Sequence, residues 1–288
     1  MGAGVAFTPD VDGDGMPELV FGLPTAGSLP NFGAGVVGIL TSSARPVPYI
    51  EGAAHALNVS SFHDAGLSSM LMGSAFGSSA AEWQGGHGGS SLLLVGAPLA
   101  TVSGSVEAGA VLAFQFDSQR DTVFNVKVLS VMDAVLSQHL AAGFRFGAAM
   151  ATVDLDGDGY DELLASFVSG TGDGDVLSLS ITPTCAVVGA TALAGSNPGF
   201  AAQLDGLPSR TGAFGSSIAV AHGARNDGKV LLLIGEQLRD FSETIPDVGA
   251  VWFLTVTSSL NVSSFSILDS TQLGKFGVNV LAAGHMHI

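Results

Sequence analysis

The sequence is poor in cysteine and in positive charge. Its single cysteine, Cys185, excludes an intrachain disulfide and a cysteine-rich zinc site. Nine Lys and Arg residues against twenty-five Asp and Glu residues give a formal net charge of −16. Nucleic acids and anionic membrane surfaces both favour clustered Lys and Arg, so this charge disfavours either as a partner.

The sequence also lacks membrane and targeting signals. No uninterrupted apolar run reaches the roughly 18 residues of a membrane helix, so we expect no direct membrane insertion of this chain. The N-terminal segment MGAGVAFTPDVD has neither the basic start nor the long apolar region of a signal peptide. Aromatic residues are sparse, whereas forty glycines predict many tight turns between short packed segments.

The chain repeats a unit that begins with Phe-Gly. Copies of this dipeptide spaced by 62 to 70 residues start at positions 76, 146, 214 and 276, and Met1-Gly2 takes the corresponding position at the start of the chain. Each unit holds four short runs rich in Val, Leu, Ile and Phe, separated by clusters of Gly, Asp, Ser and Pro. The hexapeptide LNVSSF occurs at 57–62 and again at 260–265, which supports the repeat.

Apolar runs this short, separated by turn-forming residues, predict strands rather than helices. A repeated four-stranded unit is typical of a β-propeller, so we predict an all-β fold of four-stranded antiparallel blades. Residues 1–288 then form one domain, with repeats at approximately 1–75, 76–145, 146–213 and 214–275 and a partial repeat at 276–288. One helix is expected in a connection between blades, at residues 131–142.

The partial repeat leaves two interpretations. In the first, which we favour, the chain is a fragment of a larger propeller, and the parent protein supplies further blades. In the second, residues 276–288 complete a small four-bladed ring, because propellers close by joining strands from both termini and so remove open edges.

Two aspartate-rich loops occupy the same place in the first and third units. In DLDGDGYDE and in DVDGDGMPE, alternate side chains and one backbone carbonyl are spaced to converge on a single cation. Ca²⁺ prefers about six to eight hard oxygen ligands, and the glycines permit the tight loop. The predicted ligands are Asp10, Asp12, Asp14, Met16 and Glu18 in one loop, and Asp154, Asp156, Asp158, Tyr160 and Glu162 in the other.

These loops are not EF-hands. The glutamate that an EF-hand needs at its twelfth position is replaced by Phe21 and Ala165, and both loops run into apolar strands. We therefore predict calcium loops within β-hairpins; the alternative is an Asp-Gly turn that needs no metal. The equivalent stretches of the other two units, beginning at Glu82 and Ala221, retain too few carboxylates, which predicts two sites rather than four.

Phe-Gly, a calcium loop and Gly96-Ala97-Pro98 together form the pattern of the FG-GAP repeat. Over essentially its whole length the chain resembles the β-propeller of integrin α subunits and related extracellular FG-GAP proteins. Residues 22–24, 165–166 and 235–236 depart from Gly-Ala-Pro. The resemblance implies calcium loops on one face, ligand contacts from connections on the opposite face, and a secreted or surface-exposed adhesion module. A phospholipase of this family carries its activity on a separate domain, so that activity is not expected here.

Three other motifs are weaker evidence for a binding or modification site. Gly33, Gly35 and Gly38 match GxGxxG, but they coincide with an expected strand, which argues against dinucleotide binding. His285 and His287 offer two metal ligands, with a metal-free tail as the alternative. Asn58 and Asn261 lie in glycosylation sequons, which have meaning only in a secreted protein and are otherwise ordinary strand residues.

The sequence therefore predicts a non-enzymatic, calcium-stabilised propeller, outside the cell or at its surface, that binds a protein or glycan in adhesion. No catalytic residue is predicted, and Ca²⁺ at two structural sites is the expected cofactor. Two alternatives stay open. One is an enzyme built on the propeller, a polysaccharide hydrolase or lyase. The other is an architectural spacer within a larger surface protein.

Overall fold

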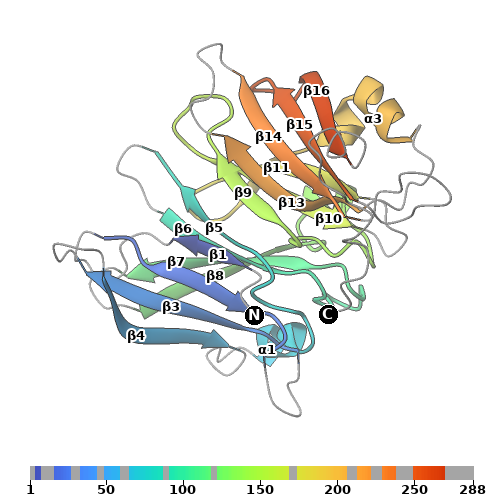
Figure 1. The fold of residues 1–288 in the computed structure, drawn as a ribbon. Coiled ribbons are helices and arrows are strands. Elements are labelled where there is room, and N and C mark those ends of the chain that lie inside the picture. Colours follow the sequence, from blue (N-terminus) through green and yellow to red (C-terminus); the bar gives the residue numbers. More distant parts are fainter. Residues whose placement is uncertain are drawn as a thin grey trace, which may run out of the picture.

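The computed structural model describes residues 4–7, 16–26, 33–43, 49–58, 65–86, 91–117, 122–168, 174–205, 213–221, 229–237 and 249–269. These residues form four antiparallel sheets of four strands each, arranged as the blades of a propeller (Figure 1). The prediction of an all-β propeller with four-stranded antiparallel blades is confirmed.

Each sheet is an up-and-down meander, because every strand pairs with the next strand in the sequence. The first sheet contains β1 (Val5–Phe7), β2 (Leu19–Leu23), β3 (Val36–Ser43) and β4 (Tyr49–Asn58). The second contains β5 (Ala80–Gln84), β6 (Ser91–Ala97), β7 (Ala110–Asp117) and β8 (Thr122–Ser130). The third contains β9 (Met150–Val153), β10 (Glu162–Val168), β11 (Gly174–Ile181) and β12 (Val187–Ala192). The fourth contains β13 (Phe214–Ala221), β14 (Val230–Glu236), β15 (Ala250–Val256) and β16 (Val262–Asp269).

Helices are short and lie in the connections between sheets: α1 (Ala65–Leu71), α2 (Leu193–Ser196) and α3 (Pro198–Asp205). The helix predicted over residues 131–142 is wrong, because only a 3₁₀ turn, Leu136–Gln138, forms there. The Asp133 carboxylate accepts the N–H of Val135 at 2.8 Å, and such side-chain bonds favour turns over continuous helix. None of the helices in the described segments has both the length and the apolar character needed to cross a membrane.

The hydrophobic core lies between neighbouring sheets. Adjacent residues of β10 show this arrangement, because successive side chains of a strand point to opposite faces. Leu163 packs in a cluster with Trp83 of the second sheet, whereas Leu164 packs in a cluster with Trp252 of the fourth. The third sheet is thus buried on both faces, and the first five residues of β10 are buried between its neighbours.

The two copies of LNVSSF occupy different structural positions. Leu57 and Asn58 end β4, with Leu57 paired to Val37. In the second copy, Val262 begins β16 after a turn at Leu260. The sequence match therefore does not mark an equivalent position. Its mixture of small, polar and apolar residues suits either end of a half-exposed strand, since strand preference depends on the packing around each residue.

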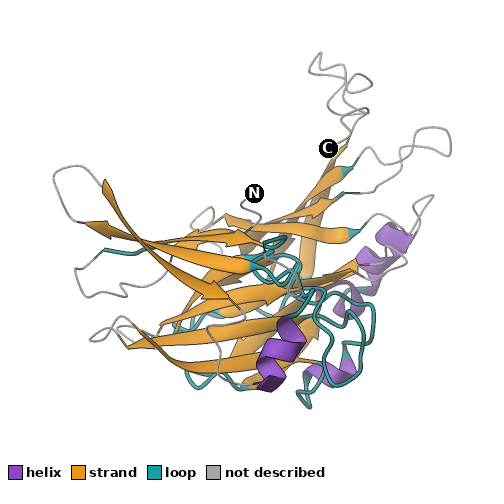
Figure 2. Ribbon diagram, turned by 90° about the horizontal axis from the view of Figure 1, so that it is seen from below, coloured by secondary structure: helices purple, strands orange, loops and turns teal. Residues whose placement is uncertain are grey.

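The loops separate into two groups at opposite ends of the strands. In the second sheet Ala110 pairs with both Ala97 and Ser130, so the connection after β6 and the connection after β8 lie at one end. The β9–β10 loop lies at the other end, where Val153 pairs with Glu162. Figure 2 shows the helices and many of the loops gathered at one end of the strands.

Candidate metal centre

The loop between β9 and β10 closes around Asp154. The N–H groups of Gly157 and Gly159 donate to the two oxygens of the Asp154 carboxylate, at 2.7 and 3.1 Å. Both glycines adopt left-handed backbone conformations, with φ of 78° and 90°. Residues with a Cβ are strained in this region, so the glycines of DGDG permit the curl.

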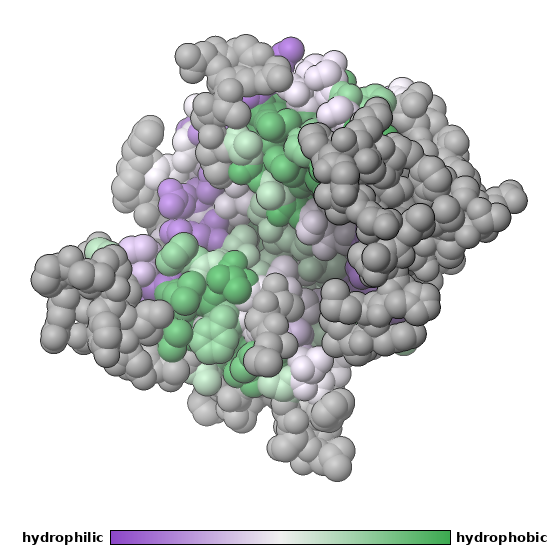
Figure 3. All heavy atoms as spheres, viewed as in Figure 1, coloured by the Kyte–Doolittle hydropathy of each residue, from purple (hydrophilic) through white to green (hydrophobic). Residues whose placement is uncertain are grey.

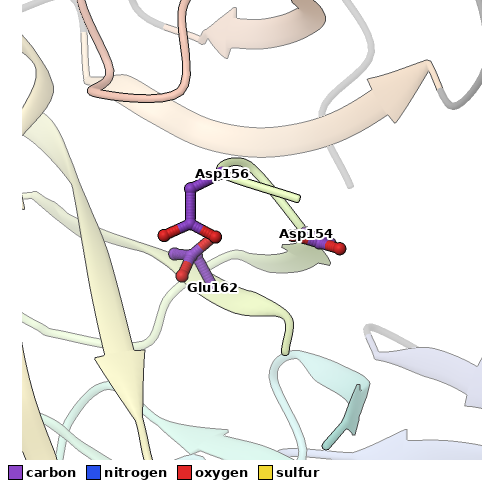
Figure 4. A group of neighbouring side chains, drawn as sticks. All are labelled: Asp154, Asp156 and Glu162. Carbon is purple, nitrogen blue, oxygen red and sulfur yellow. The ribbon is translucent and has the colours of Figure 1, made fainter. Parts of the chain in front are cut away.

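Three of the predicted ligands come together in this loop. One carboxylate oxygen from each of Asp154, Asp156 and Glu162 lies within 4.8 Å of the other two (Figure 4). Ca²⁺ takes its ligands at about 2.3 to 2.6 Å, so oxygens around one ion lie no more than about 5 Å apart. The spacing and the hard oxygen donors therefore fit calcium.

Asp158, the fourth predicted carboxylate ligand of this loop, lies outside the group of three. Asp158 accepts the N–H of Tyr160 through its Oδ1 at 2.8 Å, and both residues belong to the exposed part of the loop. Asp156 makes the equivalent turn by accepting the N–H of Asp158 at 3.1 Å. These successive turns hold the backbone of residues 154–160 in one conformation.

Glu162 is the predicted ligand whose pKa the site shifts most clearly. It is buried at the start of β10, and its Oε2 accepts the N–H of Leu155 at 2.9 Å. Burial raises the pKa of this carboxyl group to about 7; the hydrogen bond from Leu155 opposes the shift, and the charges of three neighbouring aspartates add to it. A cation at this point would relieve the repulsion among the four carboxylates.

The loop is also attached to the preceding sheet. Asp161 donates its backbone N–H to the Gln84 carbonyl at 3.0 Å, and its side chain accepts the Gln84 N–H at 3.1 Å. The buried Trp83 donates its indole N–H to the Asp161 carbonyl, and Gly86 donates to the Gly159 carbonyl at 2.8 Å. Sequence reasoning missed this contribution of β5. The available signal was that EWQGG occupies the corresponding place in the neighbouring unit.

The first aspartate loop is described only in part. Asp10, Asp12 and Asp14 lie outside the described residues. Glu18 is fully buried directly before β2, as Glu162 is buried at the start of β10, and Met16 lies two residues earlier in the chain. The corresponding loop of the fourth sheet, residues 222–228, is likewise outside the described residues, as are Phe276, Gly277, His285 and His287.

A cavity of about 500 Å³ lies between the innermost strands of the four sheets. It contains two carboxyl groups, on Glu82 and Asp161. Partial burial raises the pKa of Glu82, a hydrogen bond with Gln84 opposes this shift, and the charge of Asp161 adds to it. The cavity is lined by Phe7, Ala80, Ala81, Glu82, Gln84, Met150, Ala151, Thr152, Asp161 and Val220.

Exposed apolar side chains are found at the end opposite the aspartate loop. Met72, Val106 and Met132 are 52%, 61% and 65% exposed, and each belongs to a connection at that end. Nearby, the Arg145 guanidinium bonds the Glu107 carboxylate at 2.7 Å. Of the two sequon residues, Asn261 is exposed, whereas Asn58 ends β4.

No protein-family model matches this chain, and no curated protein matches it.

Proposed function

We propose that this chain is a calcium-stabilised, non-enzymatic propeller of the FG-GAP type that binds a protein or glycan at the cell surface or outside the cell. The main observation in support is the convergence of Asp154, Asp156 and Glu162, each of which has one carboxylate oxygen within 4.8 Å of the other two. The loop is hydrogen-bonded to β5 of the preceding sheet. An ion bound in the loop would therefore stabilise the contact between the second and third sheets.

The ion would be held by Asp154, Asp156 and Glu162, and the resemblance adds Asp158 and the Tyr160 carbonyl. Bound calcium supplies positive charge that offsets the repulsion among the carboxylates. Through the bound ion, Asp154 at the start of the loop would be linked to Glu162, the first residue of β10. The second proposed site uses Asp10, Asp12, Asp14, Glu18 and the Met16 carbonyl.

Two further observations support the assignment to an FG-GAP binding module. Phe76, Phe146 and Phe214 are all buried in the clusters between sheets, so the repeated dipeptide has a packing role. The exposed side chains of Met72, Val106 and Met132 lie at the end opposite the aspartate loop, where the resemblance places ligand contacts.

Calcium titration tests the proposal directly. A ligand that binds only the folded state stabilises it, by about 2.7 kcal/mol when its concentration is 100 times Kd. We expect the melting temperature in millimolar calcium to exceed that in EGTA, and calorimetry to find two ions per chain. Asp156→Ala and Asp12→Ala should each remove one ion, because each deletes a carboxylate ligand.

Asp133→Asn is the matched control, since this carboxylate caps a turn outside both aspartate loops. It should leave the stoichiometry unchanged. Equal melting temperatures in calcium and EGTA would refute the calcium assignment. A glycan array probed in calcium, with Val106→Asp and Met132→Asp as comparison variants, separates a binding module from a purely architectural spacer.

The enzymatic alternative has one observation in its favour, the pair of carboxyl groups in the central cavity. Glu82 and Asp161 come from different sheets, as a site assembled from several units would require. Hydrolysis or elimination of polysaccharide that is lost in Glu82→Gln but kept in Asp156→Ala would favour this function over the first.

A further inference from the structure

Phe-Gly dipeptides join consecutive sheets through a contact that repeats three times. The phenylalanine of each dipeptide lies against a glycine at or just before the third strand of the preceding sheet. Gly35 and Gly109 form parallel bridges with Phe76 and Phe146. A Cβ added to either glycine would collide with the backbone of that phenylalanine, and Gly174 stands in the same relation to Phe214.

The glycine of each dipeptide rests on a valine two positions beyond that first glycine. A Cβ added to Gly77 would lie 3.2 Å from Cγ2 of Val37, and one added to Gly147 would lie 2.9 Å from Cγ2 of Val111. The third junction pairs Gly215 with Val176 at 3.5 Å. The three valines have no exposed surface. Full burial of this valine therefore accompanies a docked Phe-Gly.

The fourth sheet presents the same set of residues. Gly249 precedes β15 with a left-handed φ of 71°, and Val251 follows it by two positions. Ser217 corresponds to Ser79, whose hydroxyl donates to the Gly147 carbonyl at 2.7 Å across the junction between the second and third sheets. Here, however, Val251 is only partly buried and Ser217 is exposed.

These residues line a groove of about 330 Å³ on the outer face of the fourth sheet. The face is apolar beyond the groove, because Leu231, Leu233 and Phe253 lie on it and remain partly exposed. Figure 3 shows a hydrophobic area over β13 and β14. The groove is lined by Ser216, Ser217, Gly235, Glu236, Gln237, Gly249, Ala250, Val251 and Leu268.

We propose that this groove is the docking site of Phe276-Gly277 of the same chain. The dipeptide lies outside the described residues and is the next Phe-Gly along the sequence. In this arrangement Phe276 takes the place beside Gly249 that Phe146 takes beside Gly109. Gly277 then covers Val251, and the Ser217 hydroxyl donates to the Gly277 carbonyl.

The length of the intervening chain permits this docking. β16 ends at Asp269, which pairs with Ala250, the residue directly after Gly249. The segment must therefore cross from β16 past β15 to the far side of Gly249, on the order of two strand spacings or 10 Å. The residues from 270 to 275 can span about 20 Å when extended. This docking depends neither on bound calcium nor on the proposed binding function.

Thiol labelling tests the docking in the full chain. With Cys185→Ser removing the native thiol, Val251→Cys reports access to the groove. Adding Phe276→Ser and Gly277→Ser should speed labelling of the thiol at least about tenfold, because burying a phenylalanine favours the closed state by that factor or more. A synthetic peptide of residues 270–288, added to this variant, should slow labelling again.

Two control positions accompany the test. Val111→Cys, at the junction of the second and third sheets, should stay protected in both backgrounds. Ser264→Cys, exposed on the outer face beyond the groove, should react equally in both. Equal labelling of Val251→Cys with and without the dipeptide overturns the proposal. Protection that increases with protein concentration also overturns it, because the groove then receives a second copy.

Discussion

Glu162 is the residue at which the aspartate loop and the sheet meet. It is the ninth residue of the loop pattern and the first of β10. Its side chain is only 8% exposed, so the carboxyl group faces the loop rather than solvent. Without a cation, ionised Glu162 must share the interior of the loop with the charges of Asp154, Asp156 and Asp158. The folded protein therefore disfavours its ionisation.

Because folding disfavours the ionisation of Glu162, the stability of the calcium-free protein should depend on pH. The folded pKa, about 7, lies above the ordinary value of 4.5. The contribution of Glu162 is thus most favourable below pH 4.5 and is lost as the pH rises through 7. The loss amounts to about 3 kcal/mol at most. Urea unfolding in EGTA, near pH 5 and near pH 8, should show the decline, and Glu162→Gln should flatten it.

Calcium should reverse the trend, because the ion binds the ionised form and binds more tightly as the pH rises. The same unfolding series with excess calcium supplies the comparison. A calcium-free protein whose stability does not depend on Glu162 over this range would contradict the buried position of the carboxyl group.

At the scale of elements, the aspartate loop is held by its own hairpin and by β5. The hairpin supplies the alternating carboxylates, while β5 supplies Trp83 and Gln84, which bond Asp161. Asp161 lies between Tyr160 and Glu162, so this attachment fixes the backbone next to two predicted ligands. The affinity for calcium should therefore depend on a strand that contributes no predicted ligand.

Trp83→Phe tests this coupling. The change keeps an aromatic ring in the core but removes the indole N–H, which leaves the partly buried Asp161 carbonyl without that donor. A fully buried group left without its partner costs about 1 to 3 kcal/mol, which sets the upper bound here. We expect a loss of stability together with weaker calcium binding at the loop of residues 154–162, measured by calorimetry.

Trp252→Phe is the matched control, because Trp252 donates its indole N–H to Glu236 at 2.7 Å within the fourth sheet. It should lower stability and leave calcium affinity unchanged. Equal calcium affinities for Trp83→Phe and the unaltered protein would show that β5 does not position the ligands.

At the scale of the whole molecule, the sheets approach one another where glycine replaces a side chain. Gly96, in β6, lies against the backbone of Gly147 and the Ser79 hydroxyl. The Gly147 carbonyl also accepts the Ser79 hydrogen bond, so the second and third sheets are joined at this point. A Cβ at residue 96 would collide with that carbonyl.

Gly96→Ala should therefore destabilise the molecule by about 1 to 3 kcal/mol, the usual cost of overpacking. Gly189→Ala is the control, since its Cβ would meet only the Ser180 side chain, at 3.8 Å. It should change stability by less than about 0.5 kcal/mol. Denaturant unfolding of both variants measures the difference; equal effects would mean that the close approach of the two sheets is not needed for stability.

The sequence by itself determined the fold class and the position of the aspartate loop between β9 and β10. Strand-length apolar runs, Asp-Gly spacing and the Phe-Gly repeat are properties of neighbouring residues along the chain, and each predicts local structure without knowledge of the rest. Glu162 could be found in the same way, from its ninth place in the loop pattern directly before an apolar run.

Only the tertiary structure decided what surrounds those residues. The bonds from Trp83 and Gln84 to Asp161 and the burial that raises the pKa of Glu162 both require two sheets to meet. The different places of the two LNVSSF copies, and the turn in place of a helix after β8, likewise depend on the packing available at each position. Such contacts join residues far apart in the chain, so no local pattern can specify them.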